Sequence, residues 1–259
     1  MPQKLVPHRP LGNTGLSVSV LGIGGWHFAC PPTQAESTRI AREAMDAGVN
    51  FFDNAWCYHN GLAEERMGAA LEGVRHQAVI MTKACTHGRG KEIAMQQLEE
   101  TLRRFKTDYL DVWQIHEVIY WNEPDSIFAP GGVIEAMDQA KRQGKVRFVG
   151  FTGHKHPDIH LSVLSHNYPF DTVQMPLNCM DTHFQSFERR VLPEALKRGM
   201  GVFGMKSFGG GAEIIKGGMA SPQEALRYSM SLPAASTVSG IDTRSEEHTS
   251  ELQSRETIS

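Results

Sequence analysis

Eight short apolar segments alternate with amphipathic segments along most of the chain, and this alternation limits its possible folds more than any other feature. The predicted strands span residues 18–23, 49–52, 78–82, 109–115, 146–151, 172–175, 202–205 and 237–239. Segments with helical spacing of apolar residues lie between them, at 37–47, 62–71, 93–105, 133–142, 157–165, 183–198 and 222–231. Such alternation predicts parallel strands joined by crossover helices, and eight repeats favour a (β/α)8 barrel over an open sheet.

Composition and charge exclude several other classes of protein. With 40% hydrophobic and 21% charged residues, the chain is typical of a globular domain and unlike a disordered, collagen-like or coiled-coil chain. The 26 basic and 29 acidic residues leave no basic excess that would point to nucleic acid or a membrane surface. No secretory signal or long apolar span is visible, so we expect a cytoplasmic protein.

The four cysteines are scattered, at positions 30, 57, 85 and 179. They form no C-x-x-C pair and no spacing that is typical of a zinc ribbon. The sequence therefore predicts reduced thiols, with neither a disulfide framework nor a metal site.

Polar residues follow three neighbouring predicted strands, where functional groups of such barrels gather. Asp53 and Tyr58 follow the second strand, Lys83 the third and His116 the fourth. The Asp53 carboxylate would hold the Lys83 ammonium, which would lower the pKa of the Tyr58 phenol from about 10. Tyr58 would then donate a proton to a carbonyl oxygen as hydride reaches the carbon, and His116 would orient the carbonyl. Each residue alone could be structural, but all four in order at strand exits predict catalysis.

Four segments resemble the aldo-keto reductase family: 9–19 (RPLGNTGLSVS), 50–55 (NFFDNA) with Tyr58, 102–111 (LRRFKTDYLD) leading to His116, and 144–150 (GKVRFVG). The resemblance covers residues 9–243 and is strongest to bacterial NADP-dependent members. It implies a TIM barrel whose amino end is closed by a hairpin formed by residues 10–19. It also implies reduction of an aldehyde or ketone to an alcohol by hydride transfer from NADP(H), with NAD(H) as the alternative. The family's catalytic residues correspond to Asp53, Tyr58, Lys83 and His116.

The resemblance further implies cofactor-binding residues at the later strand exits. They are Thr152, Gly153 and His154 after strand five, Gln174 in strand six, Met205, Lys206, Gly209, Gly210 and Gly211 after strand seven, and Ser239 and Gly240 after strand eight. His154 departs from the family, which usually has asparagine at that position. Backbone N–H groups of the glycine run could hold a pyrophosphate.

Aromatic residues near the strand exits predict the substrate pocket. Trp26, Trp56 and Trp121 would line it, and the loop at residues 117–130 would cap it. The expected partner is a small-molecule carbonyl compound with an apolar, aromatic or sugar face. Its identity and the oligomeric state are not predicted.

Residues 244–259 differ from the rest of the chain. The segment RSEEHTSELQS resembles the translation of a sequencing adapter and has one large apolar residue, so it cannot form the helix that closes a barrel. We therefore predict a truncated barrel over residues 1–243 that lacks its last helix, followed by an artefactual, disordered tail. Such a chain is expected to be poorly stable or inactive.

Three other interpretations are compatible with parts of the sequence. A metal-dependent TIM-barrel hydrolase would use His154 and His156, but the first strand exit lacks the expected histidine pair. A non-catalytic cofactor-binding relative is disfavoured by the intact set of four catalytic residues. A relative with an iron–sulfur cluster would carry its cysteines beyond residue 243, where this sequence gives no information.

Overall fold

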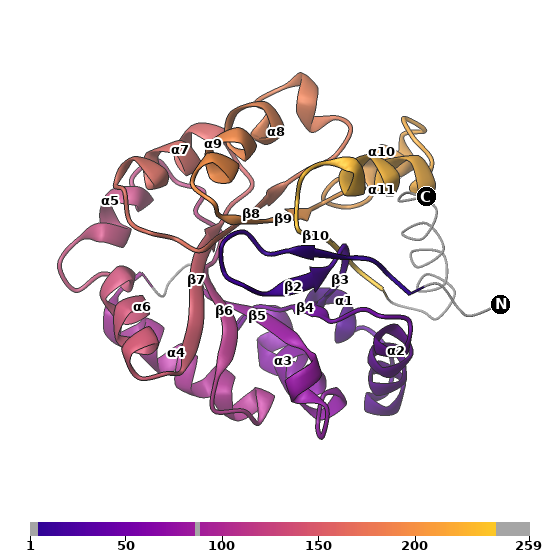
Figure 1. Ribbon diagram of the computed structural model, residues 1–259, viewed down its shortest axis with the longest axis horizontal. Coiled ribbons are helices and arrows are strands. Elements are labelled where there is room, and N and C mark those ends of the chain that lie inside the picture. The colour runs from indigo at the N-terminus through magenta and orange to yellow at the C-terminus, as the bar shows by residue number, and fades with distance from the viewer. Residues whose placement is uncertain (1–4, 86–88, 242–259) are drawn as a thin grey trace.

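A closed barrel of eight parallel strands forms the centre of the protein, as the sequence predicted. The computed structural model describes residues 5–85 and 89–241. The barrel strands are β3 (Leu21–Gly24), β4 (Phe51–Asp53), β5 (Val79–Ala84), β6 (Leu110–Ile115), β7 (Val146–Thr152), β8 (Thr172–Pro176), β9 (Gly201–Met205) and β10 (Ser236–Ser239). They follow one another in chain order, and β10 closes the ring against β3 (Figure 1).

Helices surround the barrel (Figure 1). They are α1 (Gly25–Phe28), α2 (Gln34–Asp46), η1 (Tyr58–Gly61), α3 (Leu62–Ala70), η2 (Arg75–Gln77), α4 (Lys91–Phe105), α5 (Glu123–Phe128), α6 (Val133–Arg142), α7 (Pro157–Ser165), η3 (Asp181–His183), α8 (Phe187–Arg190), α9 (Leu192–Lys197), α10 (Glu213–Lys216) and α11 (Pro222–Ser231). Within the described residues, no helix has the length and apolar character needed to cross a membrane. The predicted tail at 244–259 and the predicted absence of a last helix both concern residues outside those that the structure describes.

Two predicted elements were wrong in detail. The single helix expected at 183–198 begins only at Phe187, where Ser186 caps α8, and it is interrupted before α9. Pro193 explains the break, since it has no N–H to donate to the preceding turn. The single strand expected at 18–23 is divided, because its first residues pair in a hairpin and only Leu21–Gly24 joins the barrel.

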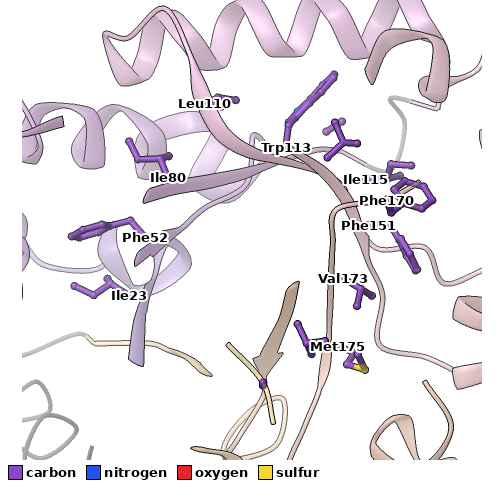
Figure 2. Packing of buried hydrophobic residues seen from close by; sticks show 14 of the residues in the cluster. Ile23, Phe52, Ile80, Leu110, Trp113, Ile115, Phe151, Phe170, Val173 and Met175 are labelled. Carbon is purple, nitrogen blue, oxygen red and sulfur yellow. The ribbon is translucent and has the colours of Figure 1, made fainter. Parts of the chain in front are cut away.

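Alternation along the barrel strands builds two apolar layers. Outward residues such as Phe52, Ile80 and Trp113 pack under the helices and are fully or almost fully buried (Figure 2). Their neighbours point into the barrel, where Phe51 and Phe203 stack with ring centroids 4.4 Å apart. Both layers follow from the two-residue period of a strand.

A hairpin closes the amino end of the barrel, as the resemblance implied. Its strands are β1 (His8–Pro10) and β2 (Ser17–Ser19), and it lies across the barrel in Figure 1. Leu11 and Val18 are fully buried within the interior cluster. Gly12 has φ +50° and lies so close to β9 that a Cβ would come within 2.3 Å of the Gly201 nitrogen. The opposite end, where the strands terminate, is therefore the end available for chemistry.

Truncating the hairpin's buried leucine tests how much this closure stabilises the barrel. We expect Leu11→Ala to lower the free energy of unfolding by about 2–5 kcal/mol, because it leaves a cavity in a close-packed interior. Urea denaturation measures the change. Leu5→Ala is the control, since Leu5 is 56% exposed. Equal midpoints for the two variants would show that the hairpin contributes little.

A buried histidine behind the barrel wall makes stability sensitive to acid. His160 on α7 packs against Phe151 and Phe187, and its Nε2 lies 3.5 Å from the carbonyl oxygen of Gln174. Burial lowers the pKa of His160 to about 4, from an ordinary value of 6.5. The unfolded chain thus takes up this proton near pH 6.5, whereas the folded chain does so only near pH 4.

Stability should therefore fall as the pH drops from 6.5 to 4, with His160 contributing about 3 kcal/mol of the loss. His160→Gln should remove that contribution, so its stability falls less steeply over the same range. Urea midpoints at several pH values measure both proteins. Parallel pH profiles would mean that His160 does not couple folding to protonation.

Candidate active site

Three neighbouring strands bring the predicted catalytic residues to the same end of the barrel. Asp53 is the last residue of β4, Lys83 is the second-last residue of β5, and His116 follows β6 directly. The strands are parallel, with Asp53 opposite Met81 and Lys83 opposite Gln114. Their carboxyl ends therefore meet, which explains why residues 30 or more positions apart become neighbours.

Lys83 and Asp53 form a buried ion pair. The Lys83 ammonium donates a short hydrogen bond to Oδ1 of Asp53 and another, 2.5 Å long, to the carbonyl oxygen of Asn54. Lys83 is 1% exposed and Asp53 is 4% exposed. Charges removed from water to this extent remain ionised only when they are paired, so each fixes the other in place.

Tyr58 lies beside this pair on the turn η1. Its ring centroid is 5.6 Å from the Lys83 ammonium and 5.6 Å from the ring of His116. The next two residues, His59 and Asn60, both adopt left-handed backbone conformations, with φ of 49° and 55°. Non-glycine residues rarely adopt this conformation, and such strain is concentrated at functional sites. The structure thus brings together the four residues that the sequence selected.

The protonation states differ in one respect from the sequence-based expectation. Burial, reinforced by the Asp53 carboxylate, raises the pKa of Tyr58 well above its ordinary value of 10. The sequence had predicted a lowered pKa through Lys83, but Asp53 neutralises that ammonium and the phenol is partly desolvated. Burial also lowers the pKa of His116. Near pH 7 the site therefore presents a neutral phenol and a neutral imidazole.

The exit of β7 lies close to a second polar cluster. Thr152 is buried, and a Cβ on Gly153 would come within 2.3 Å of the Val118 carbonyl oxygen, so only glycine fits there. His154 Nε2 lies 3.2 Å from Oε1 of Glu117, and this contact lowers the pKa of Glu117 to about 2. Sequence reasoning missed Glu117, although its position beside His116 placed it at the same strand exit.

Gln174 reaches the ion pair from the far side of the barrel. Its side-chain nitrogen lies 3.5 Å from Oδ2 of Asp53, and the residue is 1% exposed. Thr152 is paired with Gln174 in the sheet register. Gln174 therefore adjoins the Asp53–Lys83 pair, and Thr152 is its neighbour on the adjacent strand.

The glycine run after β9 forms a loop around an acidic side chain. Lys206 and Gly209 have positive φ values of 57° and 84°. The Gly211 N–H donates to Oε2 of Glu213 over 2.6 Å, and a Cβ on Gly209 would lie 2.6 Å from the same oxygen. One backbone N–H of the loop thus binds the chain's own carboxylate, whereas the sequence had suggested a pyrophosphate as the ligand of these N–H groups. Met205 is partly exposed beside this loop.

The remaining cofactor candidates lie near the end of β10. The Ser239 hydroxyl is 3.5 Å from the carbonyl oxygen of Gly240. A Cβ on Gly240 would approach the His27 ring within 2.2 Å, which places this segment against α1.

The three predicted pocket tryptophans occupy different surroundings. Trp26 is 52% exposed and stands edge-on to Tyr58, with ring centroids 5.4 Å apart. Trp121 is 63% exposed and lies 5.0 Å from the ring of His156. The Trp56 indole instead lies against α4, where its N–H donates to Glu100 over 2.8 Å. Only Trp26 is therefore placed directly beside the Tyr58 phenol by a described ring contact.

Comparison with known proteins agrees with this architecture. The Aldo/keto reductase family model matches residues 20–235, and the chain belongs to this family. The chain is 28% identical over 232 residues to 6-dehydroglucose reductase from Novosphingobium aromaticivorans, an alignment that covers 84% of this chain and 72% of that protein. It is 31% identical over 155 residues to L-galactose dehydrogenase from Arabidopsis thaliana, covering 56% of this chain and about half (48%) of that protein.

Solved structures show the same fold. One is an aldo-keto reductase from Klebsiella pneumoniae in complex with NADPH, with a TM-score of 0.77 and 20% sequence identity. That alignment covers 98% of this chain and 90% of the other. At this level of identity the likeness supports the fold alone.

Proposed function

We propose that the chain reduces an aldehyde or ketone to an alcohol, using NADPH and Tyr58 as the general acid. The observation that supports this most strongly is the arrangement of Tyr58 beside the buried Lys83–Asp53 pair and His116. A phenol, an ammonium and an imidazole gathered at one point can donate a proton and stabilise the charge left behind. Membership of the Aldo/keto reductase family agrees with this chemistry.

The residues at the later strand exits fit a nicotinamide cofactor. Gln174 offers a polar group next to Asp53, Thr152 lies beside Gln174 on the adjacent strand, and the Gly209–Gly211 loop presents backbone N–H groups with Lys206 close by. The Gly211 N–H already donates to the Glu213 carboxylate, and this contact supports the loop as a place for a negative group. Binding of a pyrophosphate there requires this carboxylate to move. The cofactor, when bound, supplies the hydride.

The chain's own residues would then act on the carbonyl oxygen. The raised pKa of Tyr58 keeps the hydroxyl protonated, so it is ready to donate as the oxygen gains negative charge. The neutral imidazole of His116 offers an N–H that can orient the same oxygen. The Lys83 ammonium, held by Asp53, stabilises the phenolate that remains on Tyr58. Exposed Trp26 provides an apolar surface for the substrate beside this group.

We propose NADPH over NADH on the basis of the family alone, and a small-molecule carbonyl compound as the substrate. A cytoplasmic location belongs to the same proposal, since four scattered cysteines without a C-x-x-C pair fit a reducing compartment. No described contact favours the hydrolase alternative, since His154 and His156 interact separately, with Glu117 and Asp158.

Cofactor titration tests the proposal. NADPH should quench the fluorescence of Trp26, raise the melting temperature, and lose its own absorbance only when an aldehyde or ketone is added. If the chain unfolds in a cooperative thermal transition and NADPH raises its melting temperature, the expectation that the chain is poorly stable is wrong. If neither NADPH nor NADH binds to the folded chain, the proposed function is wrong.

A further inference from the structure

Two cysteines and a histidine converge at the carboxyl ends of the strands, although the sequence separates them widely. Cys57 immediately precedes Tyr58, Cys85 follows β5, and His116 follows β6. Their sulfur and nitrogen atoms all lie within 4.8 Å of one another, and Sγ of Cys57 is 3.5 Å from Nδ1 of His116. In the described part of the chain, no other three cysteine, histidine or acidic side chains gather closely enough to share an ion.

The distance between Cys57 and His116 suits two ligands of a tetrahedral zinc ion. With Zn–S about 2.3 Å and Zn–N about 2.05 Å, tetrahedral angles place a ligand sulfur and a ligand nitrogen about 3.6 Å apart. The observed distance of 3.5 Å between Cys57 and His116 matches this value. Two thiolates and one neutral imidazole balance the charge of Zn²⁺, and three protein ligands leave one position for water.

The surroundings hold the ligands yet leave the site accessible. Cys85 and His116 are 8% and 6% exposed, and the Cys85 backbone N–H donates to Gln97 over 2.8 Å, which fixes the end of β5. Cys57 is partly exposed, so an ion can approach from its side. No disulfide joins the four cysteines, all of which are described, so the sulfur atoms of Cys57 and Cys85 are not oxidised to a disulfide.

We propose that Cys57, Cys85 and His116 form a Zn²⁺-binding site that inhibits the reductase reaction. Binding releases the two thiol protons and forms two Zn–S bonds and one Zn–N bond, with no change of oxidation state. The ion then holds the imidazole that the proposed function uses to orient the carbonyl. The inhibitory consequence rests on the proposed function, whereas metal binding itself does not.

Cobalt binding tests the site without any substrate. Titration of the reduced chain with Co²⁺ should give a sulfur-to-cobalt charge-transfer band that saturates at one ion per chain, and Zn²⁺ should abolish it by displacement. Cys57→Ser should weaken metal binding by at least about 100-fold, because removal of a direct ligand exceeds the 10–100-fold cost of losing an outer partner. Cys179→Ser is the matched control and should bind normally. Mg²⁺, which prefers oxygen ligands, should give no response.

Further measurements keep the proposal falsifiable. Zn²⁺ should raise the melting temperature of the unchanged chain and of Cys179→Ser but leave that of Cys57→Ser unchanged, and both variants should be compared by circular dichroism. Cys85→Ser should repeat the loss of binding. Absence of the charge-transfer band, or a band that survives Cys57→Ser in a folded protein, would overturn the site. If cobalt binds but Zn²⁺ does not slow carbonyl reduction, the inhibitory role is wrong while the site remains.

Discussion

Replacing Tyr58 with phenylalanine is expected to lower kcat for carbonyl reduction by about 10²–10⁴-fold, the usual contribution of a positioned general acid. The substitution removes only the hydroxyl, and the ring contacts with Trp26 and His116 can remain. NADPH affinity and melting temperature should therefore change little. Steady-state kinetics, with cofactor titration alongside, separates loss of chemistry from loss of folding.

A matched control exists elsewhere in the chain. Tyr168 donates its hydroxyl to Asp138 over 2.7 Å, away from the strand exits. Tyr168→Phe removes the same atom and should leave kcat unchanged. The burial that raises the pKa of Tyr58 also predicts that the unchanged chain keeps its proton donor through moderately alkaline pH. Equal rates for Tyr58→Phe and the unchanged chain would exclude Tyr58 as the acid.

Replacing Lys83 with methionine is expected to cost about 3–5 kcal/mol of stability, because it leaves the Asp53 carboxylate buried without its partner. Activity should fall as well, since the substitution removes the ammonium that we propose to stabilise the Tyr58 phenolate. The double variant Asp53→Asn with Lys83→Met removes both charges and should recover most of the stability. It should not recover activity. Urea denaturation and kinetics of the unchanged chain, the two single variants and the double variant complete a double-mutant cycle.

An exposed ion pair provides the comparison. Lys91 and Glu135 lie 3.3 Å apart with both side chains substantially exposed, so Lys91→Met should cost less than about 1 kcal/mol. If Lys83→Met and Lys91→Met are equally stable, the Lys83–Asp53 pair does not hold the site together. Additive effects of Asp53→Asn and Lys83→Met would lead to the same conclusion.

The order of the barrel strands was predictable because the spacing of apolar residues within each segment indicates whether that segment is a strand or a helix. Parallel pairing of the strands then means that their carboxyl ends meet at one end of the barrel. The boundaries were less predictable. One apolar run at 18–23 serves both the hairpin and β3, and only pairing with β1 reveals the division. Pro193 is present in the sequence, but the helical spacing of apolar residues on both sides of it predicted one continuous helix.

The candidate site was predictable where its residues end strands and unpredictable where loops place them. Asp53, Lys83 and His116 follow from the strand exits. The contact between Cys57 and His116 depends on the path of the loop between β4 and η1, which no spacing rule anticipates. The same holds for the Glu213 carboxylate in the glycine loop, since a loop's conformation decides which anion reaches its N–H groups.

Isotope transfer tests the central proposal most directly. The chain, in excess over substrate, is mixed with an aldehyde and with NADPH that carries two deuterium atoms on its reactive nicotinamide carbon, and the alcohol is examined by mass spectrometry. We expect one deuterium on the carbinol carbon, and far less alcohol from Tyr58→Phe in the same time. Alcohol that contains no deuterium, or equal amounts from both proteins, would contradict the proposed hydride transfer with Tyr58 as proton donor.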